Sequence, residues 1–305
     1  MPAACRGERL HSERVAGLMV ERPVIFDCAG DRLIGILAEP SASSTVGVLL
    51  LVGGPQYRVG SHRQFLLLAR RLAEAGIPAM RFDYRGMGDS TGSASTFEKT
   101  VQDIAAAIDT FKAMHSSLDR VVLWGLCDAA SAALLYWRAT RDSRAAGMVL
   151  LNPWVRSEQS LASAHIKYYY SKRLFERQFW SKLVHGGIDI ARAFRGFADT
   201  VVAARRRLTG TQSDAEAGFQ DRMATALTDF GGPVLIILSG QDYTAKEFLE
   251  YTRSNRRWSG LIGRDNIERA DLVDADHTFS TASWRQRVET LTVEWLKRSF
   301  CPDLR

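Results

Sequence analysis

The stretch Val121-Val122-Leu123-Trp124-Gly125-Leu126-Cys127-Asp128-Ala129 decides the fold. It opens with an apolar run typical of a strand buried on both faces, and the small residues Gly125 and Ala129 then flank a cysteine. A strand that turns sharply into a helix in this way matches the G-x-S-x-G nucleophile elbow, with cysteine in place of serine and alanine in place of the last glycine. The stretch therefore predicts a nucleophile at Cys127. The alternative is a structural thiol, because free cysteine is among the most buried residue types.

Two polar residues follow predicted strands farther along the chain. The apolar run Pro233–Leu238 leads to Asp242, and the shorter segment Ile267–Val273 leads to His277. A cysteine nucleophile needs a base, and the base needs a carboxylate that orients it. Asp242 is therefore the candidate acid and His277 the candidate base. The chain order nucleophile, acid, histidine is that of the α/β-hydrolases and differs from the orders in chymotrypsin and subtilisin.

The rest of the chain alternates strands and helices, which predicts a mostly parallel sheet with helices on both faces. A turn at Gly30-Asp31 predicts that the sheet begins with a hairpin. The other expected strands are Pro23–Asp27, Leu33–Ala38, Val46–Val52, Ile77–Tyr84 and Met148–Leu151, and the expected helices include Phe65–Ala75, Phe97–Met114 and Trp284–Phe300.

The alternation stops between Asn152 and Gly231, where helical spacing continues without a convincing strand. We therefore expect an α/β-hydrolase core formed by residues 1–152 and 232–305, with residues 153–231 inserted as a helical cap. A length of 305 residues with 46% hydrophobic content suits one large domain that carries such an insertion.

The basic character of the chain belongs to the predicted cap. Residues 156–207 contain eleven Lys and Arg and four Asp and Glu, a net charge of +7, whereas the whole chain has +6. The pattern favours packing against the core with a solvated charged face. Peripheral contact with an anionic membrane and attraction of an anionic substrate are the alternatives. No nucleic-acid motif accompanies the charge, so no nucleic acid is expected as a partner.

Over nearly its whole length the chain resembles α/β-hydrolases, and it is most similar to the exosortase A system-associated hydrolases of type 1. The segments that carry the resemblance are Gly53–Arg63, Phe82–Ser90, the cysteine elbow and Asp276–Phe279. The resemblance implies an esterase-like protein associated with bacterial exopolysaccharide export and protein-sorting loci, without a settled substrate. It also implies that Asp83 and Arg85 brace the face that carries the active site.

The oxyanion hole of such a site needs two N–H donors. The backbone of Asp128, directly after the nucleophile, is the first candidate. In related hydrolases the second donor lies just beyond a His-Gly pair, but here Gly53-Gly54 replaces that pair and Pro55 has no N–H. Gln56, through its backbone or its side-chain amide, is the substitute candidate.

Three further residues are candidates for binding substrate, namely Gly54, Arg58 and His62. The carboxylate of Asp128 would oppose formation of a thiolate at Cys127 unless a positive charge offsets it. Arg58 and His62, together with His277 and the basic cap, are the groups that could supply this charge.

Several classes of protein are disfavoured. Residues 1–21 lack the apolar segment of a signal peptide, and no run is long enough to span a membrane, so we expect a cytoplasmic protein. The four cysteines show no C-x-x-C pairing, which favours reduced thiols and no structural metal. No phosphate-binding or dinucleotide-binding motif is present, so no cofactor is expected.

Three functional classes remain. The favoured one is a cysteine-dependent hydrolase acting on a small-molecule carboxylic ester or thioester through an acyl-cysteine intermediate. The second is an acyltransferase in which a glycan hydroxyl or a carrier thiol takes the place of water. The third is a binding protein that retains the fold without catalysis, although retention of Asp242 and His277 argues against it.

Overall fold

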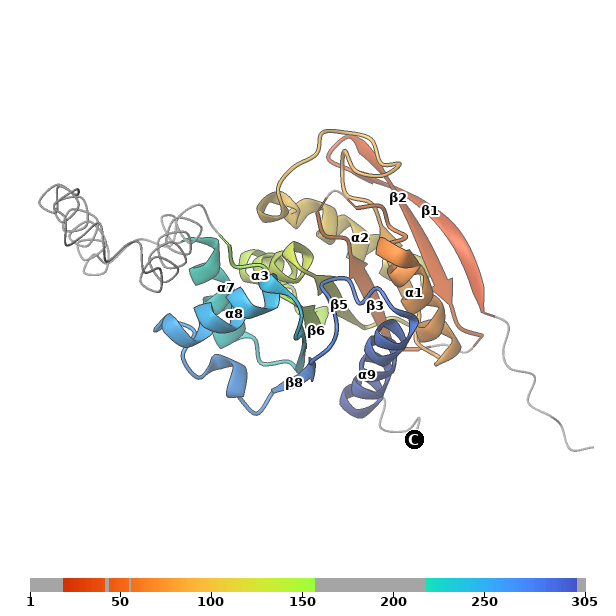
Figure 1. Ribbon diagram of the computed structural model, residues 1–305. Coiled ribbons are helices and arrows are strands. Elements are labelled where there is room, and N and C mark those ends of the chain that lie inside the picture. Colours follow the sequence, from red (N-terminus) through yellow and green to blue (C-terminus); the bar gives the residue numbers. More distant parts are fainter. Residues whose placement is uncertain (1–18, 42–43, 55, 157–217, 301–305) are drawn as a thin grey trace, which may run out of the picture. The chain divides into compact units, whose positions relative to one another are not determined.

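The computed structural model describes residues 19–41, 44–54, 56–156 and 218–300, and at its centre is an eight-stranded sheet in the order β1-β2-β4-β3-β5-β6-β7-β8 (Figure 1). β2 runs antiparallel to its neighbours β1 and β4, and all other neighbours are parallel. The predicted opening hairpin and mostly parallel sheet are confirmed. The strands are β1 (Val20–Cys28), β2 (Asp31–Glu39), β3 (Val46–Leu51), β4 (Ala79–Phe82), β5 (Arg120–Leu126), β6 (Ala145–Leu151), β7 (Val234–Ser239) and β8 (Ile267–Leu272).

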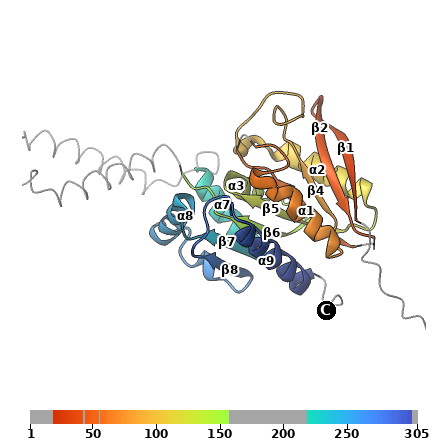
Figure 2. The ribbon, with the colours of Figure 1, turned by 45° about the vertical axis from the view of Figure 1, so that its right-hand side comes forward.

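Helices cover both faces of this sheet (Figure 2). The helices α1 and α9 contact each other on one face, and α2 and α3 contact each other on the opposite face. The predicted helices are confirmed, except that the one expected over Phe97–Met114 begins with a separate 3-10 turn at Phe97–Lys99. The described helices are α1 (Gln64–Glu74), α2 (Val101–Met114), α3 (Asp128–Thr140), α7 (Phe219–Asp229), α8 (Tyr243–Ser254) and α9 (Ala282–Phe300).

Trp124 of β5 joins the sheet to two of these helices. The side chain is 1% exposed, its ring packs edge-on against Phe65 of α1 at 5.6 Å, and its indole N–H lies 3.4 Å from the hydroxyl of Thr292 in α9. In the sheet, Trp124 lies between Leu50 of β3 and Val149 of β6. Every residue of β3 and β7 is also buried, as expected for parallel strands covered on both faces.

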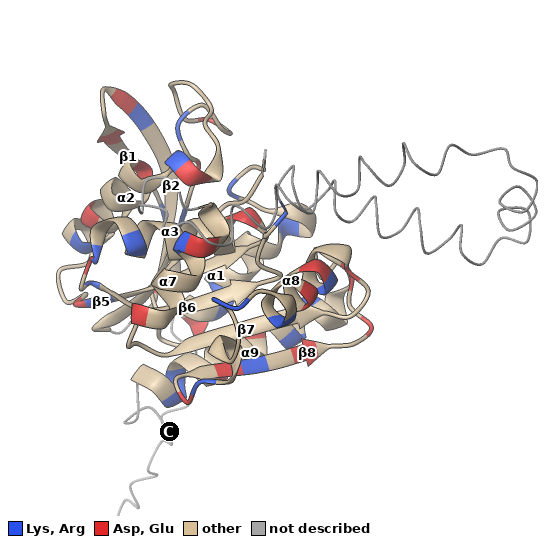
Figure 3. Ribbon diagram, turned by 90° about the vertical axis from the view of Figure 1, so that its left-hand side faces the viewer, with Lys and Arg blue, Asp and Glu red and all other residues tan. Residues whose placement is uncertain are grey.

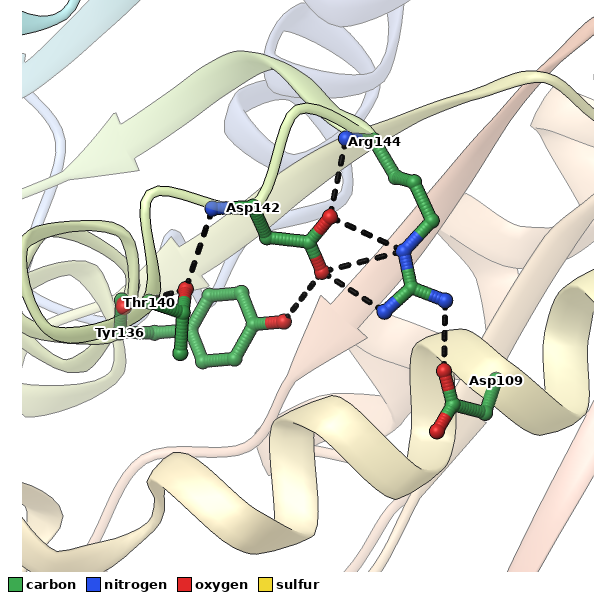
Figure 4. A network of polar contacts seen from close by, with 5 residues as sticks. All are labelled: Asp109, Tyr136, Thr140, Asp142 and Arg144. Atoms are coloured by element: carbon green, nitrogen blue, oxygen red, sulfur yellow. Dashed lines mark hydrogen bonds and ion pairs between the residues drawn. The ribbon is translucent and has the colours of Figure 1, made fainter.

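A polar network fixes the loop between α3 and β6 (Figure 4). Asp142 accepts hydrogen bonds from the hydroxyl of Tyr136 at 2.6 Å and from Nε of Arg144 at 2.9 Å, and Arg144 also reaches Asp109 of α2 at 2.5 Å. Burial opposes ionisation of Asp142, but the hydrogen bonds from Arg144 and Tyr136 outweigh it and lower its pKa to about 2. The network ties α2, α3 and β6 together at the amino end of β6, so its role is structural.

The chain forms two units. One comprises the residues up to Trp154 and from Met223 onward, and the other comprises Val155–Arg222. Most of the second unit, including the basic residues 156–207, lies outside the described residues apart from Arg156. Across the described parts, Lys and Arg are interspersed with Asp and Glu (Figure 3). Among the helices of those parts, none combines the length and the apolar composition that crossing a membrane requires.

Candidate active site

Cys127 lies at a sharp turn between β5 and α3. Its backbone angles, φ 63° and ψ −123°, are unfavourable for any residue with a side chain. Two hydrogen bonds hold it there. Its N–H donates to the carbonyl of Leu151, the last residue of β6, at 2.8 Å, and its carbonyl accepts from the N–H of Trp154, which follows β6, at 3.2 Å. Gly125 allows the helix to pass close by, since a Cβ there would lie 2.6 Å from the backbone of Ala129. This is the local geometry of a nucleophile elbow.

Asp242 lies at the carboxyl end of β7, where it caps α8. Its carboxylate accepts hydrogen bonds from the backbone N–H groups of Thr244 at 3.0 Å and Ala245 at 3.2 Å. Its Oδ2 atom also lies 2.8 Å from Nδ1 of His277. Burial raises the pKa of Asp242, but the hydrogen bond with His277 and the two backbone N–H groups outweigh burial and lower it. Asp242 is therefore a fixed anion that orients the imidazole of His277.

His277 follows β8, in the loop that leads to α9, and its side chain is about one third exposed. Hydrogen bonds with Asp242 and with Cys127 raise its pKa to about 10, and burial opposes this rise only in part. The structure thus brings together Cys127, Asp242 and His277, three residues that are far apart in the sequence. They meet beyond the carboxyl ends of β5, β7 and β8.

A pair of buried polar residues that we did not predict from the sequence supports this arrangement. Asn152, directly after β6, donates from Nδ2 to the hydroxyl of Ser239 at 2.9 Å and to the carbonyl of His277 at 3.2 Å. Ser239 in turn donates to the carbonyl of Asp276 at 2.8 Å, and its N–H bonds to Oδ1 of Asn152. These bonds fasten the loop of His277 to the ends of β6 and β7. The sequence signal was a polar residue at each of these strand ends.

The candidate oxyanion donors lie where β3 and the elbow meet. Asp128 is the first residue of α3, and its Oδ2 atom accepts a hydrogen bond from the N–H of Gly54 at 2.9 Å. The side-chain oxygen of Gln56 is buried and has no hydrogen-bond partner among the described residues. No described contact joins Gln56 to Cys127, so its role as a donor stays a prediction.

Arg58 belongs to a buried cluster that holds the loop after β3. Its guanidinium pairs with Asp83, which is fully buried, and with Asp89 at 2.8 Å, and its backbone N–H donates to Asp83 at 2.7 Å. Asp83 therefore braces this face, as the resemblance implied. Arg58 is paired with these two acids, and its suggested role in offsetting the charge of Asp128 stays a prediction.

Two further residues that the sequence analysis singled out lie in the segments after β3 and β4. His62 is exposed, with a left-handed φ of 53°. Burial raises the pKa of Asp276, but hydrogen bonds from Ser280 and Thr278, and to a smaller extent the charge of His62, lower it. This places His62 near the residue that precedes His277. Arg85, the other predicted bracing residue, pairs with the buried Asp103 at 2.7 Å.

Within the described parts of the chain, no group of three or more His, Cys, Asp or Glu side chains could hold a metal ion. The chemistry available is that of a thiol, an imidazole and a carboxylate in hydrogen-bonded series. Such a series supports formation of a covalent intermediate on sulfur, with the imidazole moving protons and the carboxylate fixing its tautomer.

Comparison with known families gives a match over most of the core. Residues 46–247 match the family described as "Serine aminopeptidase, S33". A stretch of 78 residues is 37% identical to the human protein ABHD12B. This stretch covers 26% of this chain and 20% of ABHD12B. The chain therefore matches about a fifth of the length of this curated relative.

Solved structures give matches over nearly the whole chain. The esterase Pf2001 of Pyrococcus furiosus is similar with a TM-score of 0.60 and 16% identity, covering 92% of this chain and 93% of that chain. The esterase Est1E of Butyrivibrio proteoclasticus, solved with ferulic acid bound, is similar with a TM-score of 0.58 and 16% identity, covering 90% of this chain and 98% of that chain. At such low identity the likeness concerns the fold.

Proposed function

The chain belongs to the serine aminopeptidase S33 family of α/β-hydrolases, and on this premise we propose that it is a cysteine-dependent hydrolase of carboxylic esters or thioesters. The observation that carries the proposal is the hydrogen-bonded series from Cys127 through His277 to Asp242, with Nδ1 of His277 2.8 Å from Asp242. Cys127 takes the place of the serine in the elbow motif.

The reaction begins when His277 takes the proton of Cys127 and leaves a thiolate. The sulfur attacks the carbonyl carbon, a C–S bond forms, and the carbonyl π electrons move to oxygen. When the carbonyl re-forms, the bond to the leaving alcohol or thiol breaks and His277 gives that group its proton. His277 then takes a proton from water, the hydroxide attacks the acyl-cysteine, and the thiolate leaves. Asp242 keeps the imidazole in one orientation throughout.

The first experiment detects the acyl-enzyme. The parent protein is exposed briefly to a panel of activated esters, acyl thioesters and an aminoacyl anilide, the last because the family description names an aminopeptidase. Intact mass and peptide mapping then locate any adduct. We expect an acyl group on Cys127, none in Cys127→Ala, and much slower formation in His277→Ala. Cys28→Ser is the matched control, because Cys28 is the other free thiol of the described residues and lies 3.6 Å from Asp103.

The same experiment separates the alternatives. Added glycan hydroxyls or carrier thiols would shorten the lifetime of the adduct in an acyltransferase, but not in a hydrolase that transfers only to water. Absence of an adduct with every donor, together with equal alkylation rates of Cys127 in the parent and in His277→Ala, would point to a binding protein without catalysis.

The resemblance to exosortase A system-associated hydrolases leads us to propose substrates linked to bacterial exopolysaccharide. Release of short acyl groups from an O-acylated polysaccharide, compared with release from simple esters of the same acids, tests this substrate class. We also propose that residues 153–231 form a cap. The separate unit Val155–Arg222, which interrupts the core between β6 and β7, supports that assignment.

A further inference from the structure

The side chain of Asp128 has an arrangement that the reaction described above does not explain. It lies directly after the nucleophile, where only a backbone N–H is needed. Its Oδ2 atom accepts the N–H of Gly54 at 2.9 Å, and its Oδ1 atom is buried without a hydrogen-bond partner in the described part of the chain. A buried carboxyl oxygen without a hydrogen-bond partner lowers the stability of the folded protein, so this arrangement calls for an explanation.

The loop after β3 leaves room for this carboxyl group. A Cβ atom on Gly53 would lie 2.3 Å from Oδ1 of Asp128 and 2.7 Å from the carbonyl oxygen of Leu126. No residue with a side chain could stand at position 53 while Asp128 keeps its present position. The carboxyl group of Asp128 therefore occupies the space that a side chain at position 53 would need.

The donors around this carboxyl group are those that an oxyanion hole uses. The backbone N–H groups of Gly54, Ala129 and Asp128 itself all favour the charged form of the carboxyl. Gly54 lies in the loop after β3 and Asp128 directly follows the nucleophile, the two places that supply oxyanion donors in this fold. Gly54 thereby takes the place that the sequence analysis gave to Gln56, because its N–H is the one that bonds to Oδ2 of Asp128. Pro55 has no N–H to add. An acyl oxygen that enters the hole must therefore compete with the Asp128 side chain for the N–H of Gly54.

We propose that the carboxyl group of Asp128 occupies the oxyanion hole of the resting protein and must release the N–H of Gly54 before an acyl oxygen can bind. Asp128 is then a positioning residue that controls entry of the substrate carbonyl. The expected change in acylation rate rests on the proposed acyl-cysteine chemistry. The expected change in the amide signal of Gly54 does not depend on it.

The charges around Asp128 make this release depend on pH. Burial raises its pKa, and the backbone N–H groups and the charge of His277 oppose that rise only in part. The hydroxyl of Tyr84, itself buried, also faces the charge of Asp128. A neutral carboxyl is a weaker acceptor for Gly54 and does not repel the oxyanion. Acylation should therefore lose rate as Asp128 ionises.

The first test compares acylation of Cys127 by one activated ester in the parent, Asp128→Ala and Asp128→Asn. Removal of the side chain frees Gly54, so we expect Asp128→Ala to acylate at least about tenfold faster than the parent at pH 8, with the roughly 10²–10³-fold worth of one oxyanion donor as the upper bound. Asp128→Asn keeps the shape of the side chain and lacks the charge, so its rate should not show the pH-dependent loss. Asp119→Ala removes an exposed acid that precedes β5 and should match the parent. Slower acylation in Asp128→Ala, with Asp119→Ala unchanged, would overturn the proposal.

The second test needs no catalysis. In ¹⁵N-labelled protein, the amide signal of Gly54 should titrate with pH in the parent and stay constant in Asp128→Asn. Sodium acetate, a small anion that fits oxyanion donors, should shift this signal saturably in Asp128→Ala and leave it unchanged in the parent at pH 8. Equal acetate shifts in both proteins would refute occupation of the hole by Asp128. Absence of acyl adducts in every variant would instead refute the proposed function, and the amide signals would still decide the inference.

Discussion

Nδ2 of Asn152 and the hydroxyl of Ser239 are 2.9 Å apart, and each side chain also donates to a backbone oxygen of the loop that carries His277. Side chains at the carboxyl ends of β6 and β7 thereby help to hold the loop that carries the base of the candidate site. Neither residue is expected to contact substrate, so changes at these positions separate positioning of the base from the chemistry of the reaction.

We expect Asn152→Ala to lower both stability and acylation of Cys127. The substitution leaves the N–H of Ser239 buried without its partner, which costs about 1–3 kcal/mol in the free energy of unfolding. Urea unfolding measures the first effect and the rate of adduct formation the second. Asn152→Gly is the matched control for backbone strain, because Asn152 has a left-handed φ of 43°. Full acylation rates in both variants would show that the pair does not position His277.

Cys127→Gly should make the folded protein more stable. The backbone at this position has φ 63° and ψ −123°, which glycine adopts with less strain, and relief of such strain is worth about 1–3 kcal/mol. Cys127→Ala removes the thiol but keeps the Cβ, so it should show little of this gain. Chemical denaturation of the three proteins gives the comparison. Equal stability of Cys127→Gly and Cys127→Ala would mean that the elbow stores no strain at Cys127.

Stability should fall as pH rises toward 10 because of His277. Its pKa in the folded protein is raised from 6.5 to about 10, so the imidazole binds its proton more tightly in the folded protein than in the unfolded chain. This contribution is complete below about pH 6.5 and is lost as pH rises through the folded pKa of about 10. Unfolding free energies measured from pH 6 to pH 10 should decline less steeply in His277→Gln. The same slope in both proteins would contradict the raised pKa.

Asp83→Ala should be among the most destabilising single changes in the core. Asp83 is fully buried and pairs with Arg58, whose side chain is 10% exposed, so the change leaves a buried guanidinium with one partner fewer. Breaking such a pair costs about 3–5 kcal/mol. Asp89→Ala removes the more exposed partner of the same guanidinium and should cost far less, because solvent screens an exposed ion pair. Thermal or urea denaturation of both variants checks the ranking.

Much of the fold could be predicted because the pattern of apolar residues is strong where strands are buried on both faces. The segments Val46–Val52 and Pro233–Leu238 correspond to fully buried strands, and the structure shifts their ends by only one residue. The 3-10 turn at Phe97–Lys99 was not predicted, because its composition does not differ from that of the helix that follows.

The site was harder to predict where it depends on contacts between distant side chains. The elbow sequence and the order of Asp242 and His277 led to three residues that the structure brings together. The partners of Arg58 could not be read from the sequence, because a basic residue in a loop looks the same whether it faces substrate or a buried acid. The pairing of Asn152 with Ser239 depends on strand order, which places the ends of β6 and β7 side by side.

The chain leaves β6 through Asn152, Pro153 and Trp154, and this short exit touches both halves of the candidate site. Asn152 bonds to the carbonyl of His277, the N–H of Trp154 bonds to the carbonyl of Cys127, and the carbonyl of Trp154 accepts the hydroxyl of Ser131 in α3. The next residue, Val155, begins the second unit. Three consecutive residues directly before the second unit therefore link the turn that carries the nucleophile to the loop that carries the base with which it would exchange a proton.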